Sequence, residues 1–510
     1  MKIASVALLT AVFALGGAHH ARAGATSCDG LMKLTLQQAT VTAAAIVPAG
    51  AFTAPGGGGN AQNDARLAQL PAFCRVAATL RPSADSDIKI EVWMPASGWN
   101  GKFEAVGNGG WAGTISYPAM AQALARGYAT SSTDTGHSTP GGSFALGHRE
   151  KLIDYAYRSE HEMTVQAKAI VDAFYGSAPT RSYFNGCSTG GRQALVEATR
   201  FPDDFDGIIA GAAANPKTHL DTWRIWMGLQ TLKDPGTRIP KEKLPAIHKS
   251  VLAACDGLDG LKDGLISDPT SCHFDPQVMA CSQGDGADCL TPKQVQSVKT
   301  ILGPFKSPGT GEVLFGSYQP GTELAWGLLI GGPDPYETAL DQFRYMVFDD
   351  PKWDWRTFDV DRDLATADEK LKGLLTAIDP TSLKPFFERG GKLLTYQGWS
   401  DQDISPLASV NFYSSVRHGL GDKVASQSMR LFMVPGMGHC GGGEGPNTFD
   451  MMVPLEQWVE KGTPPSRVDA SHSSNGKIDR TRPLCVYPEV ARYTGTGSID
   501  SAENFVCRQP

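Results

Sequence analysis

The sequence has 510 residues, of which 41% are hydrophobic and 19% charged, with a formal net charge of −7 at pH 7. This composition is ordinary for a globular protein and too apolar for a disordered chain, and the length allows several domains or one domain with a large insertion. The negative charge and the lack of any Lys/Arg run argue against a nucleic-acid partner, so we expect a small-molecule partner.

The first 23 residues have the pattern of a secretory signal peptide. Lys2 supplies a positive charge, residues 3–17 are apolar, and Ala21-Arg22-Ala23 is a small-residue cleavage motif before Gly24. The apolar stretch is short for a membrane span, and no later segment reaches the ~18 uninterrupted apolar residues that a span needs. The sequence therefore predicts a soluble protein, secreted or periplasmic, with no membrane partner.

Strands and helices alternate in two stretches of the chain. The first has expected strands within 88–106, at 182–184 and at 205–210, and expected helices over 161–175 and 192–200. The second has expected strands at 392–396 and 429–434, and expected helices over 406–416 and 448–461. This alternation indicates a mostly parallel sheet. Residues 216–385, rich in Trp, Pro, Gly and Cys with few clear strands, indicate an insertion between the two stretches.

A candidate nucleophile follows the strand at 182–184. Gly186-Cys187-Ser188-Thr189-Gly190 matches G-x-S-x-G between a strand and a helix, which is the context of the nucleophile elbow of α/β-hydrolases. The flanking glycines permit a tight, strained turn that exposes the hydroxyl of Ser188. The alternative is a purely structural Gly/Ser turn.

A serine hydroxyl needs a base and a group that orients the base, and α/β-hydrolases supply them in the chain order Ser, acid, His. His439 lies in a Gly-rich turn directly after the strand at 429–434, so it is the expected base. Asp401 and Asp403 both follow the strand at 392–396. We expect Asp401 to be the acid and Asp403 to cap the next helix, with Asp403 as the fallback acid.

An oxyanion hole needs backbone N–H groups, usually one from the residue after the nucleophile and one from a loop after an early strand. Thr189 is expected to supply the first. The turn Gly107-Asn108-Gly109-Gly110 is expected to supply the second, from Gly110 or Gly109.

Ten cysteines follow the predicted signal peptide, and an even number in an exported chain indicates five disulfides whose pairing the spacing leaves open. A zinc cluster is not supported, because no C-x-x-C pair or H-x-x-x-H partner is present. His161-Glu162 also lacks the second histidine of H-E-x-x-H, because position 165 is Val.

Four stretches resemble the tannase and feruloyl esterase family, which includes mono(2-hydroxyethyl) terephthalate hydrolase. They are residues 183–192, 201–208, 396–401 and 435–440, and they span most of the mature chain. The resemblance implies an α/β-hydrolase catalytic domain formed by residues 24–215 and 386–510, with residues 216–385 as an inserted lid domain. It also implies disulfides between Cys187 and Cys440, Cys28 and Cys74, Cys255 and Cys272, Cys281 and Cys289, and Cys485 and Cys507. For Cys187, the alternative is a buried free thiol.

The resemblance also implies a structural calcium ion in the lid. The stretch 255–265 carries three carboxylates and glycines that let the loop curl, and calcium prefers six to eight oxygen ligands. The implied ligands are the side chains of Asp256, Asp259 and Asp263 and the carbonyls of Leu261 and Leu265. The loop is not an EF-hand, because counting from Asp259 the twelfth position is Thr270 instead of Glu.

The leading interpretation is a secreted serine esterase that hydrolyses esters of aromatic acids, such as gallate or ferulate, through an acyl-enzyme. The aromatic preference comes from the resemblance. Two alternatives are a hydrolase of small aryl diesters such as mono(2-hydroxyethyl) terephthalate, with an arginine that binds the free carboxylate, and a non-catalytic polyphenol- or carbohydrate-binding protein. Side chains that could line an aromatic pocket are Trp223, Trp226, Trp326, Phe343, Arg344 and Tyr345.

Overall fold

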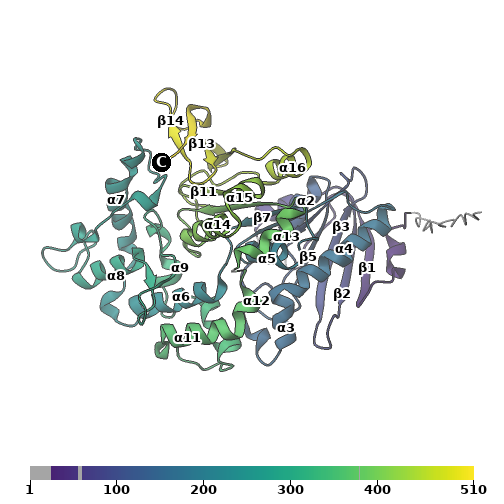
Figure 1. The fold of residues 1–510 in the computed structure, drawn as a ribbon, viewed down its shortest axis with the longest axis horizontal. Coiled ribbons are helices and arrows are strands. Elements are labelled where there is room, and N and C mark those ends of the chain that lie inside the picture. Colours follow the sequence, from purple (N-terminus) through teal and green to yellow (C-terminus); the bar gives the residue numbers. More distant parts are fainter. Residues whose placement is uncertain (1–24, 56–59, 378) are drawn as a thin grey trace, which may run out of the picture.

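The computed structural model describes residues 25–55, 60–377 and 379–510. The predicted signal peptide lies outside these residues. A nine-stranded sheet in the order β1-β2-β3-β5-β4-β6-β7-β10-β11 forms the centre of the molecule (Figure 1). Its strands are β1 (Ala39–Val47), β2 (Phe73–Leu80), β3 (Ile88–Pro95), β4 (Lys102–Val106), β5 (Ala129–Thr133), β6 (Arg181–Cys187), β7 (Gly207–Gly211), β10 (Lys392–Gly398) and β11 (Met429–Val434).

The strands from β5 to β11 in this order run parallel, and β1, β2 and β3 add an antiparallel extension next to β5. The expected mostly parallel sheet is therefore confirmed. Because parallel strands end at the same edge, the turns after β4, β6, β10 and β11 gather there, and they carry the predicted site residues.

Alternating side chains on the central strands fill the two faces of the sheet. Phe184 and Leu393 belong to one core, which packs beneath α4, α5, α13 and α14, while their neighbours Tyr183 and Leu394 belong to another, beneath α2 and α16. The covering helices are α2 (Tyr117–Ala125), α4 (Ser159–Tyr175), α5 (Thr189–Arg200), α13 (Lys384–Glu388), α14 (Pro406–Leu420) and α16 (Met452–Lys461). Three shorter helices are α1 (Ala61–Leu67), α3 (Arg149–Ile153) and α15 (Asp422–Ser428).

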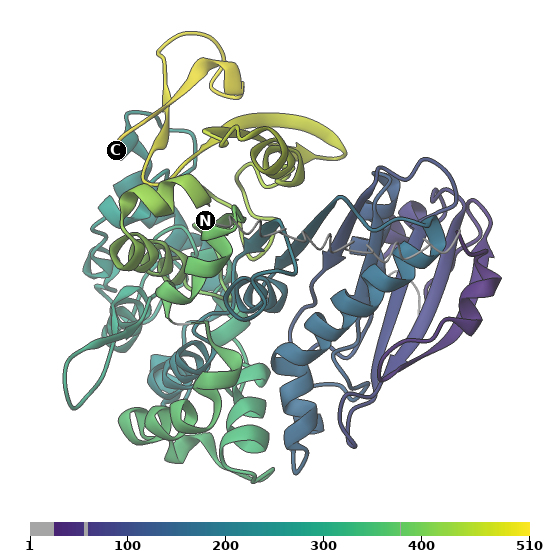
Figure 2. The same cartoon turned by 45° about the vertical axis from the view of Figure 1, so that its right-hand side comes forward.

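The segment between β7 and α13 is mainly helical and lies beside the carboxyl edge of the sheet (Figures 1 and 2). Its α-helices and strands are α6 (Lys217–Thr231), α7 (Leu244–Cys255), α8 (Pro292–Leu302), β8 (Phe305–Lys306), β9 (Val313–Phe315), α9 (Gly327–Ile330), α10 (Glu337–Asp341), α11 (Val360–Ala367) and α12 (Gly373–Leu375). Its large apolar residues form one hydrophobic cluster that includes the fully buried Trp223, Trp326 and Phe343. These three side chains are therefore core residues.

Three helices begin at residues other than those expected, and α4 differs least, since it begins at Ser159 instead of His161. Helix α5 begins at Thr189 instead of Arg192, directly after Ser188, and tight packing accounts for its glycines, since a Cβ on Gly191 would lie 2.3 Å from the carbonyl oxygen of Gly211. Helix α16 begins at Met452 instead of Thr448. The reason is that Thr448 pairs with Ser471 through backbone hydrogen bonds, and Asp450 Oδ1 accepts the N–H of Met452 at 2.8 Å.

Four strands near the C-terminus form two hairpins above the sheet in Figure 1. They are β12 (Arg467–Ser474), β13 (Lys477–Cys485), β14 (Val490–Tyr493) and β15 (Phe505–Arg508). The five disulfides implied by the resemblance are all present, with the expected pairing. Because such bonds persist in oxidising compartments, they indicate a protein that resides outside the cytoplasm.

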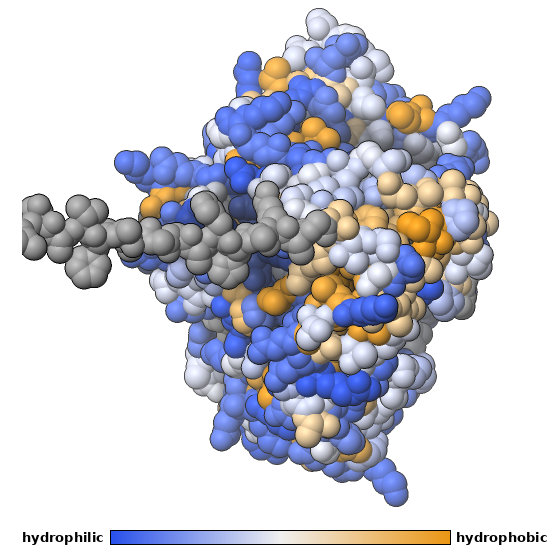
Figure 3. Space-filling model, turned by 90° about the vertical axis from the view of Figure 1, so that its right-hand side faces the viewer, coloured by the Kyte–Doolittle hydropathy of each residue, from blue (hydrophilic) through white to orange (hydrophobic). Residues whose placement is uncertain are grey.

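Across the described part of the chain, no helix has both the length and the apolar character needed to cross a membrane. The face on the side of β1 shows hydrophobic residues in groups among hydrophilic ones (Figure 3).

Candidate active site

Ser188 occupies a strained turn between β6 and α5. Its backbone has φ 64° and ψ −122°, a conformation that a residue with a side chain rarely adopts. The turn is fixed from both sides, because the N–H of Ser188 donates to Gly211 at 3.0 Å and its carbonyl accepts from Ala214 at 3.1 Å. Glycine is required beside the turn, since a Cβ on Gly186 would lie 2.4 Å from the carbonyl oxygen of Gly190. The predicted elbow geometry is therefore present.

His439 lies in the turn after β11, and its ring is held by Asp401. His439 Nδ1 donates to Asp401 Oδ2 at 2.8 Å, and the side chain of Asp401 is fully buried. Asp401 is itself held by Gln397 Nε2 at 2.7 Å and by the backbone N–H groups of Asp403 and Ile404 at 2.8 and 2.9 Å. These bonds fix the position of the Asp401 carboxylate, and the carboxylate in turn orients the ring of His439.

The second carboxylate, Asp403, lies on the other side of the ring. Its Oδ2 is 3.5 Å from His439 Nε2, and its Oδ1 and carbonyl accept hydrogen bonds from Arg224. The expectation that Asp403 caps the next helix is wrong. The N-cap position of α14 is Ser405, and the backbone of the turn is bonded by Asp401, because the tight turn places Asp401 Oδ1 over the N–H groups.

The charges around His439 shift its pKa upward. Burial lowers the pKa, but the negative charge of Asp401, the hydrogen bond to Asp401 and the charge of Asp403 together raise it above its ordinary value. The imidazolium form is thereby stabilised, which is what a base needs when it receives a proton.

Ser188 and His439 line one cavity of about 370 Å³ at the carboxyl edge of the sheet. The other lining residues are Gly109, Gly110, Cys187, Thr189, Ala214, Lys217, Arg224, Tyr336, Thr338, Asp403 and Cys440. None of the six side chains suggested for an aromatic pocket, from Trp223 to Tyr345, is among them. The volume of this cavity and its mixed polar and apolar lining fit a small organic substrate.

Helix α6 supplies charged side chains to this cavity that the sequence analysis did not identify. Lys217 and Arg224 both form ion pairs with Asp221, and Arg224 also pairs with Asp403. Burial lowers the pKa of Lys217 below its ordinary value. The residues 217, 221 and 224 recur at helical spacing, so this signal was present in the sequence.

The expected oxyanion residues Gly109, Gly110 and Thr189 also line the cavity. The hydroxyl of Thr189 donates to the carbonyl of Gly110 at 2.7 Å, and the hydroxyl of Tyr155 donates to the same oxygen at 3.0 Å. The turn is close to the elbow because Gly107 lacks a side chain, since a Cβ there would lie 2.5 Å from the Cα of Gly190.

The disulfide between Cys187 and Cys440 joins the turns that follow β6 and β11, with a Cα separation of 6.0 Å. Each cysteine is the neighbour of a predicted triad residue. The free-thiol alternative for Cys187 is excluded in this structure.

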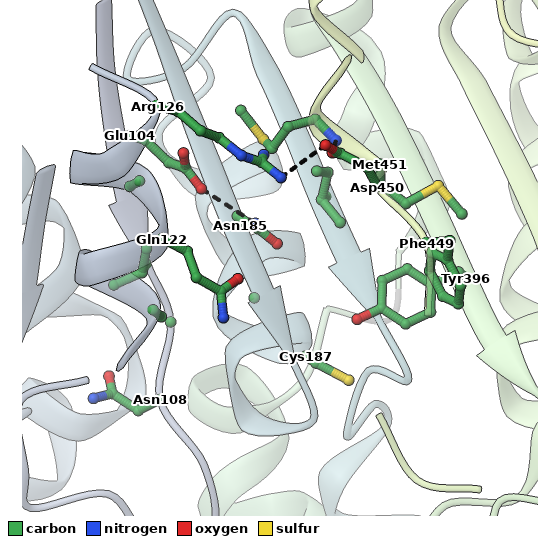
Figure 4. Close-up of a pocket in the computed structure, with 17 residues that line it drawn as sticks. Glu104, Asn108, Gln122, Arg126, Asn185, Cys187, Tyr396, Phe449, Asp450 and Met451 are labelled. Atoms are coloured by element: carbon green, nitrogen blue, oxygen red, sulfur yellow. Dashed lines mark hydrogen bonds and ion pairs between the residues drawn. The ribbon is translucent and has the colours of Figure 1, made fainter. Parts of the chain in front are cut away.

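A second cavity, of about 360 Å³, lies on the side of the sheet covered by α2 and α16 (Figure 4). Asn185 donates to Glu104 at 3.2 Å and Arg126 pairs with Asp450 at 2.7 Å. Burial raises the pKa of Glu104 to about 7. Cys187 lines both cavities, but Ser188 and His439 line only the first, so the second cavity is separate from these two residues.

The predicted calcium loop curls back on itself. Asp256 Oδ1 accepts the N–H of Asp263 at 3.1 Å, and Asp259 Oδ1 accepts the N–H of Leu261 at 2.9 Å. Arg482 pairs with Asp263 at 2.6 Å. Among the described residues, the three carboxylates are not gathered within ligand distance of one another.

The family model described as "Tannase and feruloyl esterase" matches residues 74–508. An uncharacterized esterase of Xanthomonas campestris pv. campestris is 38% identical, over 98% of this chain and 94% of its own length. A probable feruloyl esterase B-2 of Neosartorya fischeri is 33% identical, over 85% of this chain and 86% of its own.

Solved structures agree with these matches. Feruloyl esterase B of Aspergillus oryzae has a TM-score of 0.86 at 31% identity, covering 93% of this chain and 98% of its own. Tannin acyl hydrolase of Aspergillus niger shares the fold, with a TM-score of 0.76 at 22% identity and coverage of 93% and 92%. The prediction of an α/β-hydrolase fold and of a carboxylic ester hydrolase is confirmed, and the chain belongs to the tannase and feruloyl esterase family.

Proposed function

We propose that this esterase is secreted and cleaves esters of hydroxylated aromatic acids of the feruloyl or galloyl type, with Ser188, His439 and Asp401 as its catalytic triad. The observation that carries the proposal is the strained Ser188 turn in one cavity with His439, whose Nδ1 is 2.8 Å from the buried Asp401. Ser188, Asp401 and His439 follow β6, β10 and β11 in the chain order that α/β-hydrolases use, which supports this assignment.

In the first step, His439 Nε2 takes the proton of the Ser188 hydroxyl while Oγ attacks the ester carbonyl. Asp401 keeps the proton on Nδ1 and stabilises the imidazolium. The protonated ring then gives its proton to the departing alcohol, which leaves an acyl-enzyme. A water molecule attacks the acyl group by the same route and releases the acid.

The negative charge that develops on the ester oxygen requires N–H donors. We assign the N–H groups of Thr189 and Gly110 to this role, with Gly109 as the alternative, because all three residues line the cavity beside Ser188. The bonds from Thr189 and Tyr155 to the carbonyl of Gly110 hold this turn in place.

The polar lining of the cavity supports a hydroxylated acyl group. Asp403, Lys217, Tyr336 and Thr338 offer hydrogen-bond donors and acceptors to phenolic hydroxyls. A substrate with a free carboxylate, such as mono(2-hydroxyethyl) terephthalate, would need an unpaired cation. The two basic side chains that line the cavity, Lys217 and Arg224, are already paired with Asp221 and Asp403. A hydroxylated acyl group is therefore favoured.

A substrate panel tests this proposal. We expect the kcat/KM for methyl ferulate or methyl gallate to exceed that for mono(2-hydroxyethyl) terephthalate by at least about tenfold, which corresponds to one unsatisfied charge or hydrogen bond in the cavity. The reverse order would contradict the acyl assignment. Absence of turnover on every ester, including a nitrophenyl acetate, would contradict the catalytic triad as well.

We also propose that the loop 256–265 binds one structural calcium ion. The carboxylates of Asp256, Asp259 and Asp263 supply oxygen ligands, and no described residue donates a hydrogen bond to the carbonyls of Leu261 or Leu265. The chemistry of these oxygen donors suits a hard cation, and binding would draw the three carboxylates closer together and compete with Arg482 for Asp263. The ion would hold together a loop with little regular structure.

Secretion is supported by the signal-peptide pattern and by the five disulfides.

A further inference from the structure

Three metal-ligating side chains converge outside the catalytic cavity, where α4 and α5 meet the turn before β7. A ring nitrogen of His161 and carboxylate oxygens of Glu197 and Asp204 lie within 4.8 Å of one another. In residues 25–55, 60–377 and 379–510, no other group of three His, Cys, Asp or Glu side chains is gathered in this way. The convergence brings together three separate elements of the catalytic half of the chain.

Glu197 is the unusual member of this group. It lies in the last turns of α5, its exposed fraction is 0%, and neither oxygen of its carboxylate has a hydrogen-bond partner among the described residues. A buried carboxylate without a partner is costly, and native structures provide a hydrogen bond, a proton or a cation for such a group.

The nearby basic side chains bond to other atoms. Lys168 Nζ donates to the main-chain carbonyl of Asp204, and Arg389 donates to the carbonyl of Phe205 at 2.7 Å while it pairs with Asp203 and Asp206. Neither cation forms an ion pair with Glu197. The carboxylates of Glu197 and Asp204 therefore lie close together, and among the described residues the ring of His161 is the one basic side chain that forms an ion pair with either of them.

We propose that His161, Glu197 and Asp204 form a binding site for one divalent transition-metal ion of the Zn²⁺ class. Imidazole nitrogens and carboxylate oxygens are both zinc ligands, and a site with three protein ligands keeps its fourth position for water. The side chains of His161 and Asp204 are 30% and 14% exposed, so the ion and its water can enter from solvent.

Local contacts hold the ligands in position. His161 Nδ1 is 2.7 Å from Asp204 Oδ2, and its ring stacks on Phe201 with the centroids 3.9 Å apart. The proton that links Nδ1 to the carboxylate would be displaced by the ion. Because α5 starts directly after Ser188, the ion would clamp the far end of this helix to α4. We therefore expect a gain in stability and no direct part in ester cleavage.

Zinc binding to the full mature chain tests the proposal. Calorimetric titration with Zn²⁺, in excess Ca²⁺ so that the loop 256–265 is occupied, should give one site per chain. Glu197→Gln and His161→Ala should each weaken binding by at least about 100-fold, because loss of a ligand costs at least as much as loss of an outer-shell partner, which is about 10–100-fold. His148→Ala is the matched control, because His148 forms an exposed pair with Asp85, 3.0 Å long, that lacks a third ligand. This variant should bind zinc as the wild type does.

A melting experiment separates lost ligation from lost folding. Glu197→Gln keeps the size of the side chain and removes its charge, so the apo variant should fold and melt near the wild type. Zn²⁺ should raise the melting temperature of the wild type and of Asp259→Asn, but not that of Glu197→Gln. Wild-type protein that does not bind Zn²⁺, zinc binding that survives Glu197→Gln, or binding that is lost in Asp259→Asn would each overturn the proposal.

Discussion

Two carboxylates face opposite nitrogens of the His439 ring, and their contacts give them different roles. Asp401 is fully buried and bonded to Nδ1, while Asp403 is 3.5 Å from Nε2 and bonded to Arg224. The ring can keep its tautomer only through Asp401, because the proton on Nδ1 leaves Nε2 free to act as base. Asp403 lines the cavity that also contains Ser188.

Replacing each aspartate by asparagine should separate these roles. Asp401→Asn should lower kcat/KM for methyl ferulate by roughly 10⁴-fold, because the amide favours the wrong tautomer of His439. Asp403→Asn should lower it by about tenfold or less, through lost contact with the substrate. The measurement is steady-state kinetics on both variants. If Asp403→Asn proved the more damaging, Asp403 would be the acid and the assignment here would be wrong.

The sequence predicted the placement of these residues: Ser188 and His439 line one cavity and Asp401 bonds to His439, while their catalytic roles stay predictions. Ser188, Asp401 and His439 each follow a strand, and G-x-S-x-G specifies its own backbone geometry. The cavity lining was harder to predict, because the aromatic residues of the inserted segment, such as Trp223, are held in its core. Lys217 and Arg224 line the cavity instead, and only their helical spacing with Asp221 pointed to a shared face.

At the scale of the elements, one disulfide bond connects the turn after β6 to the turn after β11. The disulfide between Cys187 and Cys440 closes a sequence separation of 253 residues, whereas that between Cys281 and Cys289 closes a separation of 8. A chain-entropy account gives the long loop ~5.5 kcal/mol and the short loop ~2.5 kcal/mol of stabilisation. Of these two bonds, only the long-range one also links the turns that carry Ser188 and His439.

Removing each disulfide should therefore have different effects on rate. The double variant Cys187→Ala/Cys440→Ala should lose about 100-fold in kcat, measured well below its melting temperature, because a displacement of ~1 Å between base and nucleophile costs that much. Cys281→Ala/Cys289→Ala should melt earlier than the wild type but turn over normally. An unchanged kcat in the first double variant would show that the bond does not position the site.

A buried histidine connects α7 to the turn that follows His439. His248 lies 2.8 Å from Glu323, whose side chain is fully buried, and 3.0 Å from Glu444. Burial lowers the pKa of His248, but its bonds to Glu323 and Glu444 outweigh that effect and raise the pKa to about 9. The imidazolium ring thus bridges the inserted segment and the catalytic half of the chain.

This bridge predicts a pH dependence of stability. The pKa is raised on folding, so the stabilisation is complete below the ordinary histidine pKa of about 6.5 and is lost as the pH rises through about 9. Solvent screens the ion pair with the exposed Glu444. We therefore expect the free energy of unfolding to fall by about 1–2 kcal/mol over this pH range. Melting temperatures recorded between pH 6 and pH 10 measure this loss of stability.

His248→Gln should flatten that profile, while His418→Gln, at an exposed position of α14, should leave it unchanged. A wild-type melting temperature that rises from pH 7 to pH 10 would contradict the bridge.

The strands and helices that could be predicted are those with strong periodic patterns, such as α4 and β11. Strand β1 was not predicted, because its sequence ATVTAAAIV is rich in alanine and its pairing with β2 is a long-range contact. The hairpins β12–β13 and β14–β15 were not predicted for a similar reason, since they depend on packing against the rest of the chain and on the disulfide between Cys485 and Cys507.

In the whole molecule, the proposed calcium loop joins regions that are distant in sequence. Arg480 and Arg492, from the C-terminal hairpins, donate to the carbonyls of Asp263 and Asp259 at 3.1 and 2.8 Å. Leu265 packs against Gly436 in the turn before His439, since a Cβ on that glycine would lie 2.6 Å from the leucine side chain. The loop therefore links the inserted segment to the C-terminal hairpins and to the turn that carries His439.

Removing calcium should lower global stability before it lowers activity. A chelator should reduce the melting temperature by several degrees, because Asp256 and Asp259 lose the counter-charge of the ion while Asp263 keeps only that of Arg482. Turnover of the still folded enzyme at 25 °C should change little, and Asp259→Asn should reproduce the lower melting temperature without chelator. Elemental analysis that finds no calcium in protein prepared without chelator would contradict this site.

The central claim is that Ser188 attacks the ester and carries the acyl group. The most direct measurement is the kcat/KM of Ser188→Ala on methyl ferulate, together with mass spectrometry of the wild-type enzyme quenched during turnover. The account predicts a folded variant with activity reduced by roughly 10⁶-fold, and a ferulate adduct on the wild-type peptide that contains Ser188. A variant that turns over at near the wild-type rate, or an adduct on a different residue, would contradict it.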